Sequence, residues 1–462
     1  MSVLADVSMP PLRAENEPSG LVLAAVEKRG IPLFHARLSL PAGAARDPAG
    51  KTGLASFTSD LLRRGTARRN AEAVDALIEG MGAHLSVEAN MDECALGLTV
   101  PFELAATALD ALLEVALEPS FPADEVERAK RHTLSELQSD LDEPSTVASR
   151  ALSVLGYGAS HPYGHPLAGR TRDVETFTRA DVTAFHASCY RSQGALLSLC
   201  GDASRDELIA LARARLGQAR FAGFANTKVA PDADSLALNT ITNRDSAYAI
   251  AKRTGLTALI IHKDDSTQAQ LRIVAPGLSR RAPGWAAAFV SNSALGGGFT
   301  SLLVDAIRVE RGLSYSVSSR LSMNRHAGLS LFSSFTKNET LRELIDVSLE
   351  KMRGYAESGP SQDALAKAQR YLAGLFPFSL QGLEGLAEQL SDSVLDGTGL
   401  DSVEHYRTLI TAVTAAEAKE AARTLSPARD GAQIVIVGDS AAAQKALAGI
   451  CPVEIRPIAE FA

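Results

Sequence analysis

Cysteine is scarce in this sequence, and no two cysteines have the spacing of a metal site. The chain of 462 residues contains four, at Cys94, Cys189, Cys200 and Cys451. Because no Cys-x-x-Cys pair occurs, a cysteine zinc site is not expected. Four cysteines in a chain of this length are typical of buried small hydrophobic residues, so the sequence also argues against a disulfide scaffold.

Long runs of basic or of apolar residues are absent as well. Lys and Arg total 46 against 54 Asp and Glu, a formal net charge of −8, which argues against a phosphate-binding surface for nucleic acids. No stretch approaches the roughly 20 apolar residues that cross a bilayer. Residues 1–20 contain three prolines and no apolar run of signal-peptide length. We expect a cytoplasmic protein without nucleic-acid or membrane partners, although a periplasmic protein whose signal peptide has been removed would show the same features.

The chain is long enough for two to four domains, and its two halves resemble each other. Near the start of each half, a strand-like segment ends at a proline, Pro41 in the first half and Pro276 in the second, 235 positions apart. Near the end of each half, an apolar strand closes with Gly-Asp, at Asp202 and at Asp439, 237 positions apart. These matching offsets indicate an internal duplication.

Between these landmarks, period-2 and period-3.6 patterns alternate in the same order. The first half has strands over 84–100, a helix over 104–117 and a helix beginning at Pro122; the second has strands over 314–335, a helix over 341–352 and a helix beginning at Pro360. We therefore predict an α+β fold of two homologous domains, each a largely antiparallel sheet with helices packed on one face. The predicted boundaries are 1–222, a linker over 223–256, and 257–462.

The segment from Gly53 to Thr66 is the most informative part of the first half. It reads Gly-Leu-Ala-Ser-Phe-Thr-Ser-Asp-Leu-Leu-Arg-Arg-Gly-Thr. This resembles the helix that carries the inverted zinc motif of the insulinase/pitrilysin family of metallopeptidases, typically Gly-Leu-Ala-His-x-x-Glu-His followed by apolar residues and Gly-Thr. The resemblance places Ser56 and Asp60 at the two histidine positions and Ser59 at the glutamate position.

These replacements remove the chemistry of the zinc motif. Histidines at i and i+4 project from one helix face and can share one zinc, and the glutamate acts as general base on zinc-bound water. A serine hydroxyl is a poor zinc ligand and is no base near neutral pH. The family's third ligand lies about 76 positions after the second histidine, where this chain has Glu136. We expect no metal to be bound by this chain; the alternative is weak binding of a hard cation by Asp60 and Glu136.

The histidines of this chain offer no substitute ligands. His161 and His165 are four residues apart, but the prolines and glycine around them predict a loop, where that spacing does not align side chains. The other histidines are scattered and are interpreted as structural or surface residues: His35, His84, His132, His186, His262, His326 and His405.

Residues 294–317 resemble the second signature of the same family. They give a glycine-containing turn, a helix with Arg308, and Gly-Leu-Ser-Tyr ending at Tyr315. Leu302 stands where relatives often have arginine. The resemblance implies that Arg308 and Tyr315 bind substrate and stabilise the oxyanion in a partner's site, which suits their charged and phenolic donors. The alternative is a surface charge beside a half-buried aromatic residue.

The resemblance covers nearly the whole chain and implies a function by complementation. Short members of the family pair two-domain chains into a chamber of four domains. This chain is then expected to be a zinc-less subunit, inactive alone, of a heterodimeric zinc metalloendopeptidase for peptides or unfolded polypeptides, with zinc in a homologous partner subunit. Peptide would add a strand to a sheet edge near residues 85–89. The alternatives are a structural assembly subunit, a homodimeric peptide-binding protein and, least favoured, a hydrolase with another metal or a serine nucleophile.

Overall fold

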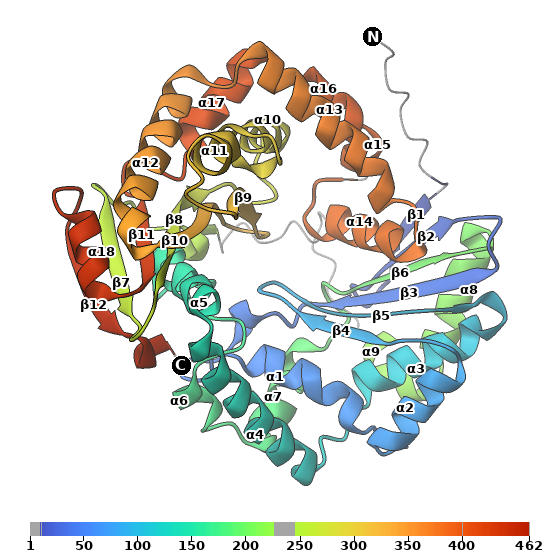
Figure 1. Ribbon diagram of the computed structural model, residues 1–462. Coiled ribbons are helices and arrows are strands. Elements are labelled where there is room, and N and C mark those ends of the chain that lie inside the picture. Colours follow the sequence, from blue (N-terminus) through green and yellow to red (C-terminus); the bar gives the residue numbers. More distant parts are fainter. Residues whose placement is uncertain (1–9, 11, 226–244, 400, 462) are drawn as a thin grey trace.

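The computed structural model, which describes residues 10, 12–225, 245–399 and 401–461, contains two six-stranded sheets (Figure 1). The first has the strand order β1-β2-β6-β3-β5-β4, in which β2 and β6 are parallel and all other neighbours antiparallel. Its strands are β1 (Leu12–Asn16), β2 (Val22–Glu27), β3 (Leu33–Leu40), β4 (Ser86–Ala89), β5 (Cys94–Pro101) and β6 (Leu196–Gly201).

The second sheet repeats this order as β12-β7-β11-β8-β10-β9. Its strands are β7 (Thr257–His262), β8 (Gln268–Gly277), β9 (Val317–Met323), β10 (Gly328–Lys337), β11 (Gln433–Gly438) and β12 (Val453–Pro457). The two sheets differ at one edge, because β1 is antiparallel to β2 whereas β12 is parallel to β7. The predicted duplication and α+β class are confirmed.

Helices pack against both sheets, most of them on the outer face of the sheet of their own half. Those of the first half are α1 (Leu54–Leu61), α2 (Ala71–Gly80), α3 (Ala105–Leu117), α4 (Ala123–Ser139), α5 (Pro144–Tyr157), α6 (Thr171–Val174), α7 (Arg179–Cys189), α8 (Arg205–Leu216) and α9 (Ala222–Ala225). Those of the second half are α10 (Trp285–Asn292), α11 (Leu302–Val304), α12 (Leu341–Ser358), α13 (Gln362–Ser379), α14 (Leu383–Leu395), α15 (Asp401–Glu404), α16 (Tyr406–Ala412), α17 (Ala415–Leu425) and α18 (Ser440–Leu447).

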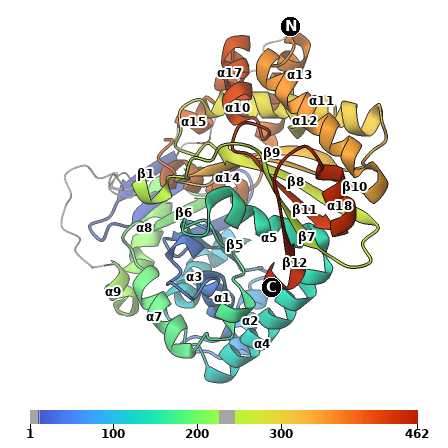
Figure 2. The same ribbon diagram turned by 90° about the vertical axis from the view of Figure 1, so that its left-hand side faces the viewer.

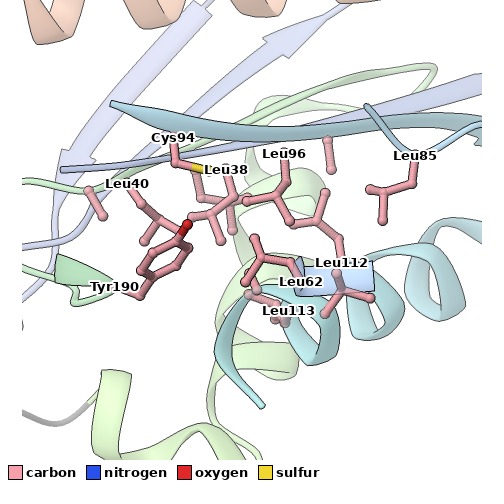
Figure 3. Packing of buried hydrophobic residues seen from close by; sticks show 14 of the residues in the cluster. Leu38, Leu40, Leu62, Leu85, Cys94, Leu96, Leu112, Leu113 and Tyr190 are labelled. Carbon is pink, nitrogen blue, oxygen red and sulfur yellow. The ribbon is translucent and has the colours of Figure 1, made fainter. Parts of the chain in front are cut away.

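The core of the first domain lies between its sheet and these helices (Figure 3). Leu38 of β3 and Leu96 of β5 point from the sheet toward Leu112 of α3, and all three are buried. Cys94 and Tyr190 close one end of this core. All four cysteines are free. Cys94, Cys189 and Cys200 are buried, as predicted for small hydrophobic residues, whereas Cys451 is half-buried.

The inner face of each sheet is covered by a helix from the other half of the chain. In the first half, α5 packs on β8 and β11 of the second sheet, with Val147 and Ala151 in one cluster with Ile261 and Val437 (Figure 2). In the second half, α14 packs on β6 and β3 of the first sheet. This exchange explains why β2 and β6 are almost continuously buried instead of alternating.

The tips of two corresponding hairpins meet between the domains. The backbone N–H of Arg325, in the β9–β10 turn, donates to Asp92 in the β4–β5 turn at 2.9 Å. The Arg325 guanidinium contacts Glu93 at 3.4 Å and Asp396 at 3.3 Å. Tyr163, from the predicted His-Pro-Tyr-Gly-His loop, is fully buried and donates its hydroxyl to Asp92 at 2.5 Å. The Tyr163 hydroxyl also accepts from the backbone N–H of His326, in the β9–β10 turn, at 3.3 Å, so this loop takes part in the contact between the domains.

The segment Trp285–Val309 corrects one expectation from the sequence. It is the one described stretch long and apolar enough to cross a membrane by length and composition, with a mean hydropathy of 1.3. It contains α10, two π-helical turns and α11, and 56% of its most apolar window is buried in the protein. Val290, Leu303 and Ile307 lie in the core of the second domain, so the hydropathy of this segment has a structural reason.

Candidate functional site

The helix α1 carries the predicted zinc-motif positions, and Asp47 fixes its first turn. The Asp47 carboxylate accepts hydrogen bonds from the backbone N–H groups of Gly53 at 2.7 Å and Ala55 at 2.8 Å. Gly53 has a φ of 93°, and a Cβ there would lie 2.6 Å from the Cα of Gly169, so only glycine fits. Burial raises the pKa of Asp47 to about 7, against the lowering effect of its two hydrogen bonds.

Ser56, Ser59 and Asp60 lie on this helix in different environments. Ser59 is buried, and its hydroxyl donates to the carbonyl oxygen of Ser56 at 2.7 Å. Ser56 is half-buried and Asp60 is exposed. The Ser59 hydroxyl is therefore engaged within the helix, and only Asp60 of the three presents a charged ligand outward.

Asp60 and Glu136 both line a pocket of about 710 Å³ between α1, β4 and α4. The pocket walls reduce the hydration of the Asp60 carboxyl and raise its pKa to about 6, and repulsion from Glu136 adds to this effect. Arg64 and His132 act in the opposite direction. The tertiary structure thus brings together the two carboxylates that the sequence places 76 positions apart.

The residues around Asp60 do not fit a zinc site. A catalytic zinc site takes three protein ligands, usually including histidine nitrogen. His132 lies in the pocket, but its Nδ1 contacts the Glu136 carboxylate at 3.2 Å. In the described part of the chain, no three His, Cys, Asp or Glu side chains are grouped so as to hold a metal ion.

Sequence reasoning set aside two pocket residues, His84 and His132, as scattered histidines. His132 precedes Glu136 by four residues on one helix, and this i, i+4 spacing is the signal that places both side chains on one face. His84 carries no comparable signal, because it enters the pocket from the loop before β4.

The free edge of the first sheet borders the same pocket. Among the described strands, β4 pairs only with β5 and is the last strand of the sheet. Ser86, Val87 and Glu88 of this strand line the pocket. An edge strand presents backbone N–H and C=O groups to which an extended peptide can pair. The predicted strand-addition segment at residues 85–89 is therefore next to the Asp60 pocket.

Arg308 and Tyr315 form a second cluster, in the second domain. Arg308 lies in a π-helical turn (Asp305–Val309), a local geometry that often occurs at functional sites. Its guanidinium carbon lies 4.3 Å from the ring centre of Phe299 and 5.4 Å from that of Tyr315. Both rings are exposed, Phe299 at 73% and Tyr315 at 82%. Within the described residues the Arg308 side chain has no carboxylate partner, which leaves its donors available to a ligand.

The structure brings Arg308 and Tyr315 together but does not join them to the Asp60 pocket. The pocket is lined entirely by residues of the first half. In both views α1 lies in the lower part of the molecule and α11, which precedes Arg308, in the upper part (Figures 1 and 2). The sequence analysis did not single out Phe299, although its position just after the glycine-rich turn could have identified it. The alternative interpretation of Tyr315 required a half-buried ring, but its side chain is mostly exposed.

Two family models match the chain. One described as "Insulinase (Peptidase family M16)" matches residues 24–169, and one described as "Peptidase M16 inactive domain" matches residues 176–372. Together they cover most of both sheets and the segments containing Ser56, Glu136, Arg308 and Tyr315.

Curated proteins and solved structures agree with these matches. The chain is 27% identical over 407 residues to an uncharacterized zinc protease of Mycobacterium tuberculosis, covering 85% of this chain and 86% of the relative. It is 24% identical over 335 residues to a probable mitochondrial-processing peptidase subunit beta of Schizosaccharomyces pombe, covering 72% and 67%. The crystal structure of a peptidase M16 inactive domain from Pseudomonas fluorescens matches with a TM-score of 0.82 at 26% identity, covering 93% and 98%. With its two family matches and its fold, this chain belongs to the insulinase/pitrilysin family, peptidase family M16.

Proposed function

We propose that this chain is the zinc-less subunit of a heterodimeric M16 peptidase that acts on peptides or unfolded polypeptides. The observation that carries the proposal is the contrast between its two clusters. The Asp60 pocket is lined by carboxylates, and the described residues there give no zinc ligand set, whereas the half-buried Arg308 lies next to the exposed ring of Tyr315 and has no carboxylate partner among the described residues.

A homologous partner with an intact zinc helix would supply the metal, its water and the general base. The role of this chain is to bind and orient the peptide. The Arg308 guanidinium and the Tyr315 hydroxyl donate hydrogen bonds to the peptide carbonyl oxygen. These hydrogen bonds become stronger as negative charge develops on that oxygen during the reaction. Phe299 and Tyr315 hold the guanidinium between two rings, which limits its freedom before substrate binds.

The free edge of β4 gives the proposal a second peptide contact. Extended peptides of many different sequences can pair with Ser86–Ala89, because the hydrogen bonds of such pairing use main-chain groups. The pocket beside this edge contains both acidic and basic side chains, among them Glu88, Arg64 and Arg128. This surface suits a substrate with mixed charge.

A native pull-down with mass spectrometry tests the proposal. A stoichiometric partner with an intact His-x-x-Glu-His helix is expected. In the purified complex, Arg308→Ala should lower kcat/KM about 100-fold, as removal of an oxyanion donor does in other enzymes. Leu409→Ala, at an exposed position of α16, is the control and should leave kcat/KM unchanged. If the chain purifies only with itself, the heterodimer is wrong, and a homodimeric peptide-binding or scaffolding role takes its place.

A further inference from the structure

The second domain has a pocket that the proposed function does not use. It has a volume of about 660 Å³ and lies between the loop before α11, the C-terminal half of α12 and the N-terminal half of α13. Its lining is mainly apolar and includes Phe299, Leu302, Tyr355, Ala364, Ala368 and Tyr371. A pocket of this size and lining accommodates one large apolar side chain with room for neighbouring atoms.

The first domain is closed at the corresponding place by an ion pair. The Arg69 guanidinium donates to the Glu114 carboxylate at 2.6 Å. Helices α1 and α2 of the first domain begin 231 positions before α10 and α11 of the second, and by this offset Thr300 corresponds to Arg69. Helix α3 begins 236 positions before α12, so Glu350 corresponds to Glu114. The second domain keeps the carboxylate and lacks the arginine, and Thr300 and Glu350 both line the open pocket.

Ser301 is a buried polar group in this pocket. It is 4% exposed and lines the pocket, and its Oγ has no hydrogen-bond partner among the residues that the structure describes. Ser301 precedes α11 at the N-cap position but makes no side-chain capping hydrogen bond. A buried hydroxyl without a partner is unfavourable. A ligand that places a polar group against Ser301 would satisfy it.

The pocket is lined by two carboxylates, Asp305 and Glu350, and two ammonium groups, Lys351 and Lys367. Glu350 forms an ion pair with Lys351, with 3.5 Å between their charged atoms. Among the described residues neither Asp305 nor Lys367 has an ion-pair partner. Lys367 lies on α13 and Asp305 at the end of α11, so an anionic group is favoured on the α13 side of the pocket, next to the Lys367 ammonium. Phe299 lines the pocket and also stacks on Arg308, so the pocket opens beside the proposed substrate-binding pair.

We propose that this pocket is a specificity site for an apolar side chain of a bound peptide, with preference for a carboxylate beside that side chain. Phe299, Tyr371 and the alanines of α13 surround the apolar group, Ser301 bonds a polar atom of the peptide, and Lys367 attracts the carboxylate. The inference rests on the proposed function for the identity of the ligand as a peptide.

A small probe tests the pocket without partner or turnover. N-acetyl-phenylalanine is added to the full chain, and saturation transfer from protein to its ring protons is measured by NMR. Wild type should give transfer, with N-acetyl-phenylalaninamide weaker and N-acetyl-serine near background. Thr300→Arg, which rebuilds the Arg–Glu pair of the first domain and fills the pocket, should abolish the transfer. Ala364→Phe, which fills the pocket from α13, should do the same.

Two further variants separate the pocket from its surroundings. Leu375→Arg adds the same side chain to an exposed position of α13 outside the pocket, and it should leave the transfer at the wild-type level. Arg308→Ala should also leave it unchanged, although this variant is expected to lower the activity of the peptidase complex. Absence of transfer in wild type, or transfer that persists in Thr300→Arg, overturns the proposal that this pocket binds an apolar side chain. Loss of transfer in Arg308→Ala shows that the probe binds at Arg308 instead, and this too overturns it.

Discussion

The Arg308 guanidinium lies between the exposed rings of Phe299 and Tyr315, 4.3 Å and 5.4 Å from their centres. Both aromatic residues are more than two-thirds exposed, which is unusual for rings of this size without a ligand or partner to cover them. The three side chains come from the glycine-rich turn, the π-helical turn and the segment before β9. The arrangement holds a cation in place at the surface while its donors stay free.

Phe299→Ala is expected to weaken the positioning of Arg308 without unfolding the protein. A cation–π contact at an exposed site contributes about 0.5–1 kcal/mol, so kcat/KM of the assembled peptidase should fall about two- to fivefold. Phe378→Ala removes an exposed ring that has no contact with Arg308 and serves as the control. Equal activities of the two variants in a steady-state peptide assay would contradict a positioning role for Phe299.

Restoring histidine at two positions should create a zinc site. Ser56→His combined with Asp60→His places two imidazoles at i and i+4 on α1, and Glu136 faces the same pocket. Isothermal titration with zinc should show one site for the double variant. Adding Glu136→Ala should weaken that site by at least about tenfold. If Glu136→Ala leaves the affinity unchanged, Glu136 does not occupy the third ligand position.

Asp60 is expected to make stability depend on pH. Because the pKa of Asp60 is raised to about 6 in the folded protein, its contribution to stability is fully present below the ordinary carboxyl pKa and is lost as the pH rises through about 6. Asp60→Asn should therefore be more stable than wild type at pH 8, by up to about 1 kcal/mol given the exposure of the side chain.

Urea unfolding at pH 4.5 and pH 8 checks the Asp60 prediction. The gain from Asp60→Asn should be small at the lower pH and larger at the higher one. Glu357→Gln, at an exposed position near the end of α12, should show no such difference. A variant that is destabilised at pH 8 would mean that the Asp60 carboxylate makes a stabilising interaction there.

Arg325 should hold the two domains together. Its guanidinium contacts Glu93 and Asp396, all three side chains being about 11% exposed or less. Arg325→Met removes one of two cations at each buried carboxylate, since Arg37 stays 3.4 Å from Glu93 and Arg280 stays 3.6 Å from Asp396. It should cost about 1–3 kcal/mol in the free energy of unfolding. Adding Asp396→Asn should recover part of this loss, since it removes one of the two carboxylates that lost a cation. Additive effects in denaturant unfolding would show that the residues act independently.

Local patterns predicted most of the elements because their causes are local. The alternation over 84–100 became β4 and β5, the helical pattern over 104–117 became α3, and the helix expected at Pro122 begins one residue later as α4. The offsets of 235 and 237 positions correspond to sheets with the same order in five of six strands. The roles given to Ser56, Ser59, Asp60, Glu136, Arg308 and Tyr315 remain predictions, as do the domain boundaries.

Other features left no local trace in the sequence. The periodicity of α5 and α14 predicts an apolar face but not that each would cover the sheet of the other half. The contact between Arg325 and Glu93 joins residues 232 positions apart. The orphaned hydroxyl of Ser301 is visible only after every neighbouring donor and acceptor has been placed.

The sequence by itself determined the duplication, the secondary structure and the residue types at the two motif segments, because φ/ψ preference and hydrophobic period act over a few residues. Only the tertiary structure decided that Asp60 faces Glu136, that Phe299 stacks on Arg308, and that Thr300 leaves a pocket open where Arg69 closes one. The reason is that contacts, desolvation and cavities depend on which distant surfaces meet, and a single sequence does not encode that meeting in any local pattern.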